Sequence, residues 1–347
     1  MNNMKKIGLS ALAGSLVAFS SANAELTVSG GASVGVSSSN EIRASSYYMA
    51  DSINFTNSGE TDNGLTVTQK VELEGAGTDN YSISIAGDFG TIAFHGHGGD
   101  SVMSGWDDKT PSAYEEVWAY ATVDTTTTGT NDEVVMINGR AGNSLWRYDS
   151  PTVSGISVHA SYVQAAAAAS ENDHGDINSY TDFGVQFAPE MMEGLTIGYA
   201  TAEVDESTTI SNDESTLWVT YTSGPISVGY QTSEVDGQNA TQEDEATMMS
   251  ISYAVTDDLS VSYGIAEVDL GSSTTDQESK GISASYTMGG VSISVAMNET
   301  DNVGGSTAST HDLEAVSYTH LRAHETREDL GCRLRLEKKK GGGGGGG

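Results

Sequence analysis

Apolar and polar side chains alternate with a period of two along most of the chain. From Leu26 to Ser37, apolar or tiny residues occupy one set of alternate positions, and serine, threonine or glycine occupies the other. Such alternation predicts a β-strand whose two faces meet different surroundings. Helix-period patterning is almost absent, so we expect an all-β chain. The alternation is clearest in residues 65–73, 81–85, 156–162, 195–199, 217–221, 226–230, 249–253, 259–265, 282–286 and 291–297.

The connections between these segments alternate in length. Seven are short, at residues 58–64, 87–90, 150–155, 189–194, 222–225, 255–258 and 288–290. Eight are long and polar, near residues 38–46, 74–80, 98–142, 164–180, 201–215, 232–247, 266–280 and 298–311. Seven turns and eight loops join sixteen strands, and strict alternation of this kind is typical of a transmembrane antiparallel β-barrel rather than a sandwich.

A barrel of sixteen strands of about ten residues is wide enough for an aqueous channel. Apolar side chains would face lipid, and polar ones would line a wet interior. Seven tyrosines on the apolar side are expected at the lipid headgroups; they are Tyr162, Tyr199, Tyr221, Tyr230, Tyr253, Tyr263 and Tyr286.

Residues 1–24 have the features of a secretory signal peptide. Lys5 and Lys6 precede an apolar run over residues 7–19, and Ala22, Asn23 and Ala24 form a cleavage site of the A-x-A type. The run is too short to span a membrane as a helix. We expect the mature chain to begin at Glu25 and to be exported.

The composition changes abruptly at Val316. Seven of the fifteen basic residues and the only cysteine, Cys332, lie in residues 316–347, which end in seven glycines. Residues 316–326 (VSYTHLRAHET) resemble the translation of transposase sequencing-adapter DNA, and residues 329–340 resemble the other end of the same adapter. We therefore interpret residues 316–347 as an adapter-derived artefact and the chain as truncated near residue 315, within its sixteenth strand. The barrel should then leave its seam incomplete or take residues 317–325 as a substitute strand.

The remaining residues, 25–315, are strongly acidic, with six basic and 44 acidic side chains. Such a balance argues against binding to nucleic acid, which requires clustered Lys and Arg. This segment contains no cysteine, and it has no run of 18 apolar residues that could form a spanning helix.

Three motifs in this segment resemble the general porins of the Gram-negative outer membrane. They are ELTVSGGASVGV (25–36), GDFGTIAFHGH (87–97) and NSLWRYDSP with GISVHASY (143–162). The resemblance covers essentially all of residues 25–315. It implies a homotrimer of sixteen-stranded barrels in outer-membrane lipid, in which the third long loop folds into the lumen. Carboxylates on that loop would then face basic residues on the wall.

The third long loop, 98–142, is also the longest of the eight, and we take it as the candidate constriction loop. Lys70 has the parity of Thr66 and Thr68, so it should face the lumen, whereas Arg43 lies near the first loop and Arg147 on the sixth strand. The candidate constriction residues are Asp100, Asp107, Asp108, Glu115, Glu116, Asp124, Lys70, Arg43 and Arg147. The family usually has a cluster of arginines here, so the basic half is thin in this chain.

The chain also contains weaker candidates for metal binding. His95 and His97 share the lumen parity with Asp100 just beyond, which is a weak metal candidate, and His159 is a third polar lumen residue. The acidic groups Asp107/Asp108, Asp257/Asp258 and 243–245 could bind Ca²⁺ but lack the spacing of a known calcium loop. An enzyme in a barrel would need a Ser/His/Asn constellation or similar near the rim, and the sequence shows none.

These observations predict no cofactor and no catalysis. The expected function is passive, size-limited diffusion of small hydrophilic solutes and ions with a preference for cations. The alternative is a secreted, acidic, β-rich adhesin or binding protein, although such a protein should show a constant repeat length.

Overall fold

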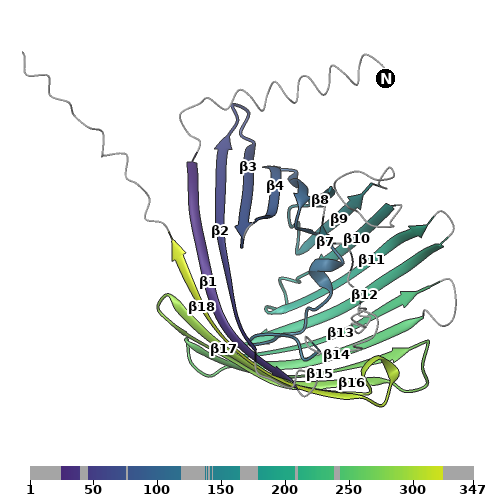
Figure 1. The fold of residues 1–347 in the computed structure, drawn as a ribbon. Coiled ribbons are helices and arrows are strands. Elements are labelled where there is room, and N and C mark those ends of the chain that lie inside the picture. The colour runs from purple at the N-terminus through teal and green to yellow at the C-terminus, as the bar shows by residue number, and fades with distance from the viewer. Residues whose placement is uncertain are drawn as a thin grey trace, which may run out of the picture.

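In the computed structural model the chain forms a single closed barrel of antiparallel strands (Figure 1). The structure describes residues 25–39, 46–75, 77–118, 137, 139, 141–142, 144–164, 179–207, 210–237 and 243–322. The proposed signal peptide, Arg43, Asp124 and residues 323–347 lie outside this part of the chain. Within it, no helix is both long enough and apolar enough to cross a membrane.

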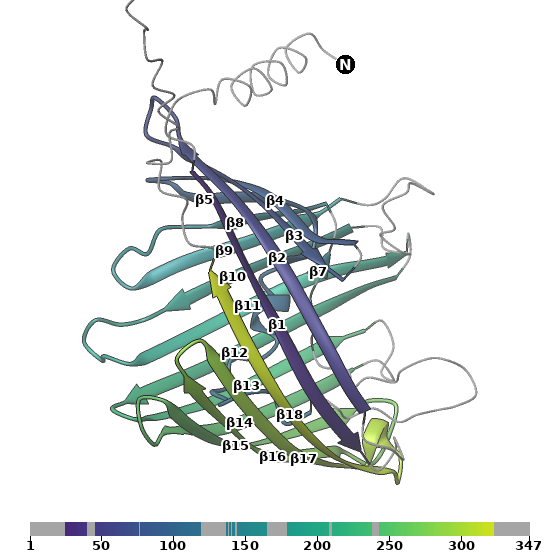
Figure 2. The ribbon, with the colours of Figure 1, turned by 60° about the vertical axis from the view of Figure 1, so that its left-hand side comes forward.

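Sixteen strands follow one another around the barrel in chain order, and the last strand pairs with the first. Figure 2 shows β18 lying beside β1 at this closure. The barrel strands are β1 (Glu25–Ser39), β2 (Ser46–Glu60), β3 (Thr66–Glu74), β4 (Gly77–Gly87), β5 (Gly90–His97), β8 (Leu145–Asp149), β9 (Ile156–Val163), β10 (Ser179–Phe187), β11 (Leu195–Ser207), β12 (Ile210–Ser223), β13 (Ile226–Asp236), β14 (Asp244–Ala254), β15 (Leu259–Leu270), β16 (Gln277–Met288), β17 (Val291–Asp301) and β18 (Ser309–Arg322).

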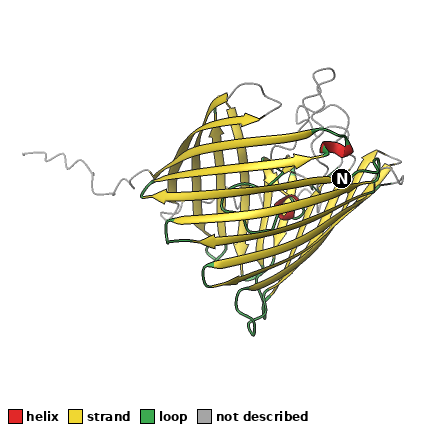
Figure 3. Cartoon of the chain, turned by 90° about the horizontal axis from the view of Figure 1, so that it is seen from below, coloured by secondary structure: helices red, strands yellow, loops and turns green. Residues whose placement is uncertain are grey.

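The predicted number of strands, their antiparallel pairing and the barrel itself are confirmed. The seven short turns also lie where the sequence places them, now at residues 61–65, 88–89, 150–155, 188–194, 224–225, 255–258 and 289–290. Figure 3 shows short turns, drawn in green, at one end of the tilted strands. We call this the short-turn end.

The long loops are shorter than predicted because the strands continue into them. Residues 201–215 were expected to be a loop, yet β11 and β12 stay paired from Leu195↔Tyr221 to Ser207↔Ile210. In this hairpin Glu203 is directly opposite Asp213 on the outer face. Backbone hydrogen bonds hold a ladder together whatever the side chains, so strands can run past the apolar band into polar sequence. Alternation of apolar residues marks only the part of each strand within that band.

The outer face carries the apolar set of each strand. All seven tyrosines of the predicted girdle lie there with 40–51% of their surface exposed. Exposed aliphatic side chains such as Val228, Ile251 and Ile282 share this face. The outward assignment of the apolar positions is thus confirmed.

The interior differs from the expected uniformly polar lining. Two apolar clusters lie inside the barrel, each joining the third long loop to the wall. The larger cluster contains Val102, Met103, Trp106, Ile137, Leu145, Val163, Tyr180, Ala200, Ala202, Val204 and Trp218. The smaller contains Val117, Ala246, Met248, Ala266, Val268 and Leu270. Inward positions are therefore apolar where the loop covers them.

The last strand, β18, includes residues 316–322 of the segment that resembles translated adapter DNA. These residues pair with β1 from Gly35↔Val316 to Ser29↔Arg322 and with β17 as far as Val291↔Thr319. The barrel seam is closed by them. The origin of the segment stays a prediction.

Candidate pore constriction

The third long loop enters the barrel directly after β5. A two-residue strand, β6 (Gly99–Asp100), pairs with β7 (Ala141–Gly142), and a single 3₁₀ turn, η1 (Ser104–Trp106), follows. Figure 1 shows η1 inside the ring of strands. Three hydrogen bonds fix this entry to β9 and β10: Val102 N to Ser161 Oγ (3.0 Å), Met103 N to Asp182 Oδ2 (2.9 Å) and Ser101 Oγ with Tyr180 OH (3.1 Å).

The loop then crosses the interior along strands β13 to β16. Gln231 on β13 is fully buried, and both the nitrogen and the oxygen of its side-chain amide form hydrogen bonds with the loop backbone. Its Nε2 donates to the Trp106 and Asp107 carbonyls (2.7 and 3.1 Å), and its Oε1 accepts from Lys109 N (2.7 Å). Two further wall hydroxyls bind the loop: Ser250 Oγ donates to the Pro111 carbonyl (2.7 Å), and Ser262 Oγ accepts from Ala113 N (2.9 Å).

The far end of the described loop reaches the seam of the barrel. The Tyr114 hydroxyl donates to Glu314 Oε2 on β18 (3.0 Å), and the Tyr48 hydroxyl on β2 donates to Glu314 Oε1. Glu314 is only 1% exposed. Residues 101–117 therefore lie against the inner wall from β9 to β18, and they occupy the lumen as a bridge.

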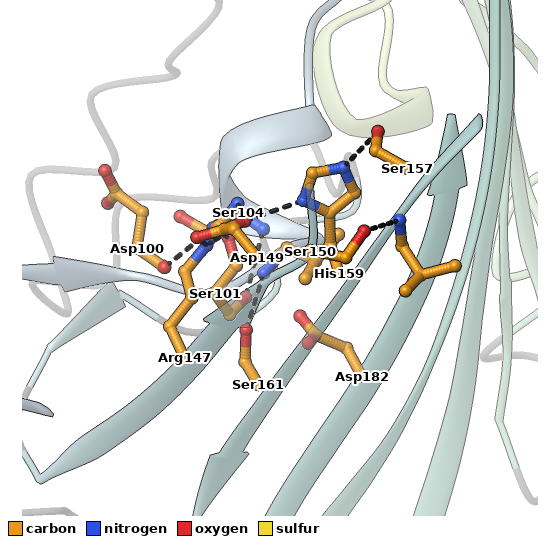
Figure 4. A network of polar contacts seen from close by, with 12 residues as sticks. Asp100, Ser101, Ser104, Arg147, Asp149, Ser150, Ser157, His159, Ser161 and Asp182 are labelled. Atoms are coloured by element: carbon orange, nitrogen blue, oxygen red, sulfur yellow. Dashed lines mark hydrogen bonds and ion pairs between the residues drawn. The ribbon is translucent and has the colours of Figure 1, made fainter. Parts of the chain in front are cut away.

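Arg147 on β8 holds the root of the loop (Figure 4). Its Nη1 donates to the carbonyls of Asp100 (3.0 Å) and Ser101 (2.8 Å), and its Nε and Nη2 bind the Asp149 carboxylate at 3.1–3.2 Å. The Asp100 carboxylate points away from this guanidinium. Arg147 is thus near the loop as predicted, but its charge is matched by Asp149, a residue that the sequence analysis did not single out.

The structure brings Asp107, Asp108 and Glu116 together in the loop. Asp107 Oδ1 accepts from Asp108 N, and Asp108 Oδ1 accepts from the Thr110 backbone and hydroxyl, all at 2.8 Å. Burial raises the pKa of Asp107, and it raises the pKa of Asp108 to about 6. Burial also lowers the pKa of the neighbouring Lys109 ammonium. This part of the loop is a partly desolvated group of carboxylates with one half-buried lysine.

Glu115 lies apart from that group, facing the seam. Burial, and after it the Glu314 carboxylate, raises the pKa of Glu115 to about 7. Two carboxylates close together in a partly dry site resist simultaneous ionisation. The sequence analysis missed Glu314, although its lumen parity on β18 was a usable signal.

Lys70 lies on β3 at the expected lumen parity, in the row that contains Ser82 and His95. The prediction that His97 shares this face is wrong. A register shift in the β4–β5 pair sets His95 opposite Ser82 but His97 opposite Tyr81, on whose ring it stacks (centroids 6.4 Å apart). The β-bulge turns His97 outward, because it adds one residue to the alternation.

The bulge separates the weak metal candidate His95, His97 and Asp100. No group of three or more His, Cys, Asp or Glu side chains in the described ranges is arranged to bind a metal ion. Calcium at the acidic loops stays a prediction.

Ser157, His159 and Asp149 form a hydrogen-bonded series that the sequence analysis did not identify. Ser157 Oγ is 3.0 Å from His159 Nε2, and His159 Nδ1 is 2.6 Å from Asp149 Oδ1. The order matches that of a hydrolase triad. Ser157 is only 7% exposed, however, and the Trp106 ring packs edge-on against His159 with centroids 5.5 Å apart. The series is closed by the loop and acts here as packing and charge balance for Arg147.

The fold of the chain is found in solved porins. An anion-selective porin from Comamonas acidovorans matches with a TM-score of 0.63 and 14% identity, covering 86% of this chain and all of that one. A porin refined at 1.8 Å resolution matches with a TM-score of 0.61 and 17% identity, covering 86% of this chain and all of that one. OmpT, an outer membrane protein of Vibrio cholerae, matches with a TM-score of 0.61 and 15% identity, covering 87% of this chain and 99% of that one.

No curated protein sequence matches the chain significantly. A family model described as Gram-negative porin matches residues 8–316. The match stops where the composition changes. A match over most of the chain, together with the closed barrel of sixteen strands, shows that this protein belongs to the Gram-negative porin family, and so is a diffusion channel of the outer membrane and not an enzyme.

Proposed function

We propose that the channel conducts small hydrophilic solutes and ions by passive, size-limited diffusion, with a preference for cations. The observation that carries this proposal is the charge on the described interior. Carboxylates gather on the loop, whereas Arg147 is bound by Asp149 and Lys109 is half-buried beside Asp107 and Asp108. A passing ion therefore meets more uncompensated negative charge than positive charge.

The expected preference is modest. One carboxylate about 8 Å from an ion contributes roughly 0.5–2 kcal/mol at an effective dielectric constant between about 20 and 80. Salt weakens this further, with a Debye length of about 8 Å at physiological ionic strength. Several such charges would favour cations by a small factor, far below the discrimination of a carbonyl-ring filter.

The sign of the preference depends on side chains and not on the fold. The Comamonas acidovorans porin of the same fold is described as anion-selective. In our proposal the opposite sign in this chain follows from its composition, because residues 25–315 contain 44 acidic and six basic side chains.

Further parts of the proposal concern assembly and processing. Export through a signal peptide cleaved after Ala24 is supported by the charged, apolar and small-residue regions in sequence. A homotrimer is supported by the resemblance of residues 25–36, 87–97 and 143–162 to trimeric porins. The role of residues 98–142 as the constriction is supported by the wall contacts of residues 101–117.

Planar-bilayer recording tests the proposal. The full chain is refolded, inserted, and measured for single-channel steps and for reversal potential across a KCl gradient. We expect conductance steps in groups of three and a reversal potential shifted toward that of K⁺. A reversal potential of zero, or one shifted toward that of Cl⁻, would overturn the cation preference. Conductance steps that occur only singly would overturn the trimer.

A further inference from the structure

The described loop does not fill the interior evenly. Residues 101–117 pack on the wall from β9 to β16 and reach β18 at Tyr114 and Glu115, both beside the Glu314 carboxylate. On the other side, a cavity of about 660 Å³ lies against β1, β2, β3 and β18. Its lining includes Ser29, Ser33, Ser52, Asn54, Glu72 and Glu74, with Tyr318 and Thr319 of β18, and none of the loop residues that the structure describes.

The strand register places these polar side chains on the inner face in adjacent rows. Ser29, Asn54 and Glu72 form one row across three strands, and Gly31, Ser52 and Glu74 form the next. Asn54 Nδ2 donates to Glu72 Oε1 at 3.0 Å, so the amide holds this carboxylate at the surface of the cavity. The cavity wall therefore combines small residues and Tyr318 with one amide and, in its inward-facing rows, two carboxylates.

From this cavity and register we propose that solutes pass along the β1–β3 wall, and that Glu72 and Glu74 are its specificity-determining residues for small hydrophilic cations. This deepens the proposed function and rests on it. The resemblance to porins implied basic residues on the wall opposite the loop, whereas the inner face of β3 carries two carboxylates beside its one lysine, Lys70.

The order of charges along β3 determines which charge an ion entering from the extracellular side meets first. Lys70, Glu72 and Glu74 share the inner face, and Glu74 is nearest the end with long connections, which is the extracellular end in outer-membrane barrels. A cation entering from outside thus meets Glu74 and Glu72 before it meets Lys70. An anion meets two repulsive charges first, so anion entry is disfavoured at the mouth.

The first test removes these charges with isosteric substitutions. Glu72→Gln with Glu74→Gln should lower the K⁺/Cl⁻ permeability ratio at 0.1 M salt at least about twofold. Lys70→Gln should raise the ratio. Glu278→Gln is the matched control, because Glu278 carries the same charge on the outer face of β16 and should leave the ratio unchanged.

The second test follows the route itself. Ser52→Cys is made in a Cys332→Ser background and treated with cationic and anionic methanethiosulfonate reagents of similar size. The cationic reagent should reduce the conductance several times faster, and Glu72→Gln with Glu74→Gln should remove most of that difference. Modification that leaves the conductance unchanged would overturn the route.

The two proposals fail differently. A cation-preferring wild type whose ratio does not change in the double variant would overturn the role of Glu72 and Glu74 and leave the proposed function standing. A wild type without cation preference would overturn the proposed function, and the thiol reaction at position 52 would still decide the route.

Discussion

Gln231 shows how one side chain can position a whole loop. It is fully buried on the inner face of β13, and its amide makes three hydrogen bonds to the backbone of residues 106–109. A fourth bond, from Nε2 to Thr216 Oγ1 (2.9 Å), fixes the amide on the wall. A backbone N–H or C=O group of the loop that lost its hydrogen bond to Gln231 while remaining buried would destabilise the loop's attachment by about 1–3 kcal/mol.

Gln231→Leu should therefore loosen the loop without opening the barrel. We expect the loop to be cleaved by protease about tenfold to a hundredfold faster, which corresponds to the loss of roughly 1.4–2.8 kcal/mol of local stability. Gln69→Leu is the control, since Gln69 is exposed on the outward parity of β3. Wild-type cleavage of the Gln231→Leu protein would mean that the apolar clusters alone hold the loop.

Individual residues were predictable only as far as simple alternation holds. The lumen parity of Lys70 and His95 followed from counting along their strands, and the structure agrees. His97 was misplaced because a β-bulge is a property of a strand pair and leaves no mark in one strand's sequence. Gln231 and Glu314 were missed because their partners lie more than 100 residues away in the chain.

At the scale of elements, the turn that precedes β11 lies against the end of β12. Gly194 has φ +85°, and a Cβ there would lie 2.0 Å from the carbonyl oxygen of Thr222, near the end of β12. Thr222 N also donates to the Gly194 carbonyl at 3.0 Å. Gly224 also has positive φ (+57°), but a Cβ there would meet nothing within 4 Å.

Alanine substitutions at these two glycines distinguish the cost of positive φ from the cost of a clash with neighbouring backbone. Gly224→Ala should cost about 1 kcal/mol, the strain of an L-residue at positive φ. Gly194→Ala should cost distinctly more, about 2–4 kcal/mol, because two backbones must also move apart. Urea unfolding of the refolded barrels in detergent measures both. Equal midpoints for the two variants would show that the turn before β11 and the end of β12 move apart without cost.

Over the whole molecule, the barrel was predictable and the path of its loop was not. Period-two alternation and alternating connection lengths determine strand number and closure, because both are local properties of the sequence. The loop's course over β9 to β18 depends on contacts between distant residues, such as Val102 with Ser161 and Tyr114 with Glu314. The sequence placed Val268 in a long loop, but the structure has it in β15, buried in the apolar cluster that contains Met248 and the loop residue Val117.

The assembled interior predicts an unusual pH dependence of ion preference. Burial holds the pKa of Asp108 at about 6 and, with the Glu314 carboxylate, that of Glu115 at about 7, whereas exposed carboxyls titrate near 4. Raised acid pKa values mean that both groups gain protons as the pH falls from 8 to 5. The lumen then loses negative charge, so the K⁺/Cl⁻ permeability ratio should fall over this range and not only below pH 5.

Reversal potentials at 0.1 M KCl, measured at half-unit steps of pH, test this prediction while the Debye length is still about 10 Å. Asp108→Asn with Glu115→Gln should remove the change between pH 8 and 5, because neither amide titrates. The attachment of the loop to the wall should become more stable as the pH falls, because protonation removes the cost of burying two charges. Protease should therefore cleave the loop more slowly at pH 5 than at pH 8. A permeability ratio that stayed constant down to pH 5 would show that water reaches both carboxylates freely and that the loop leaves them solvated.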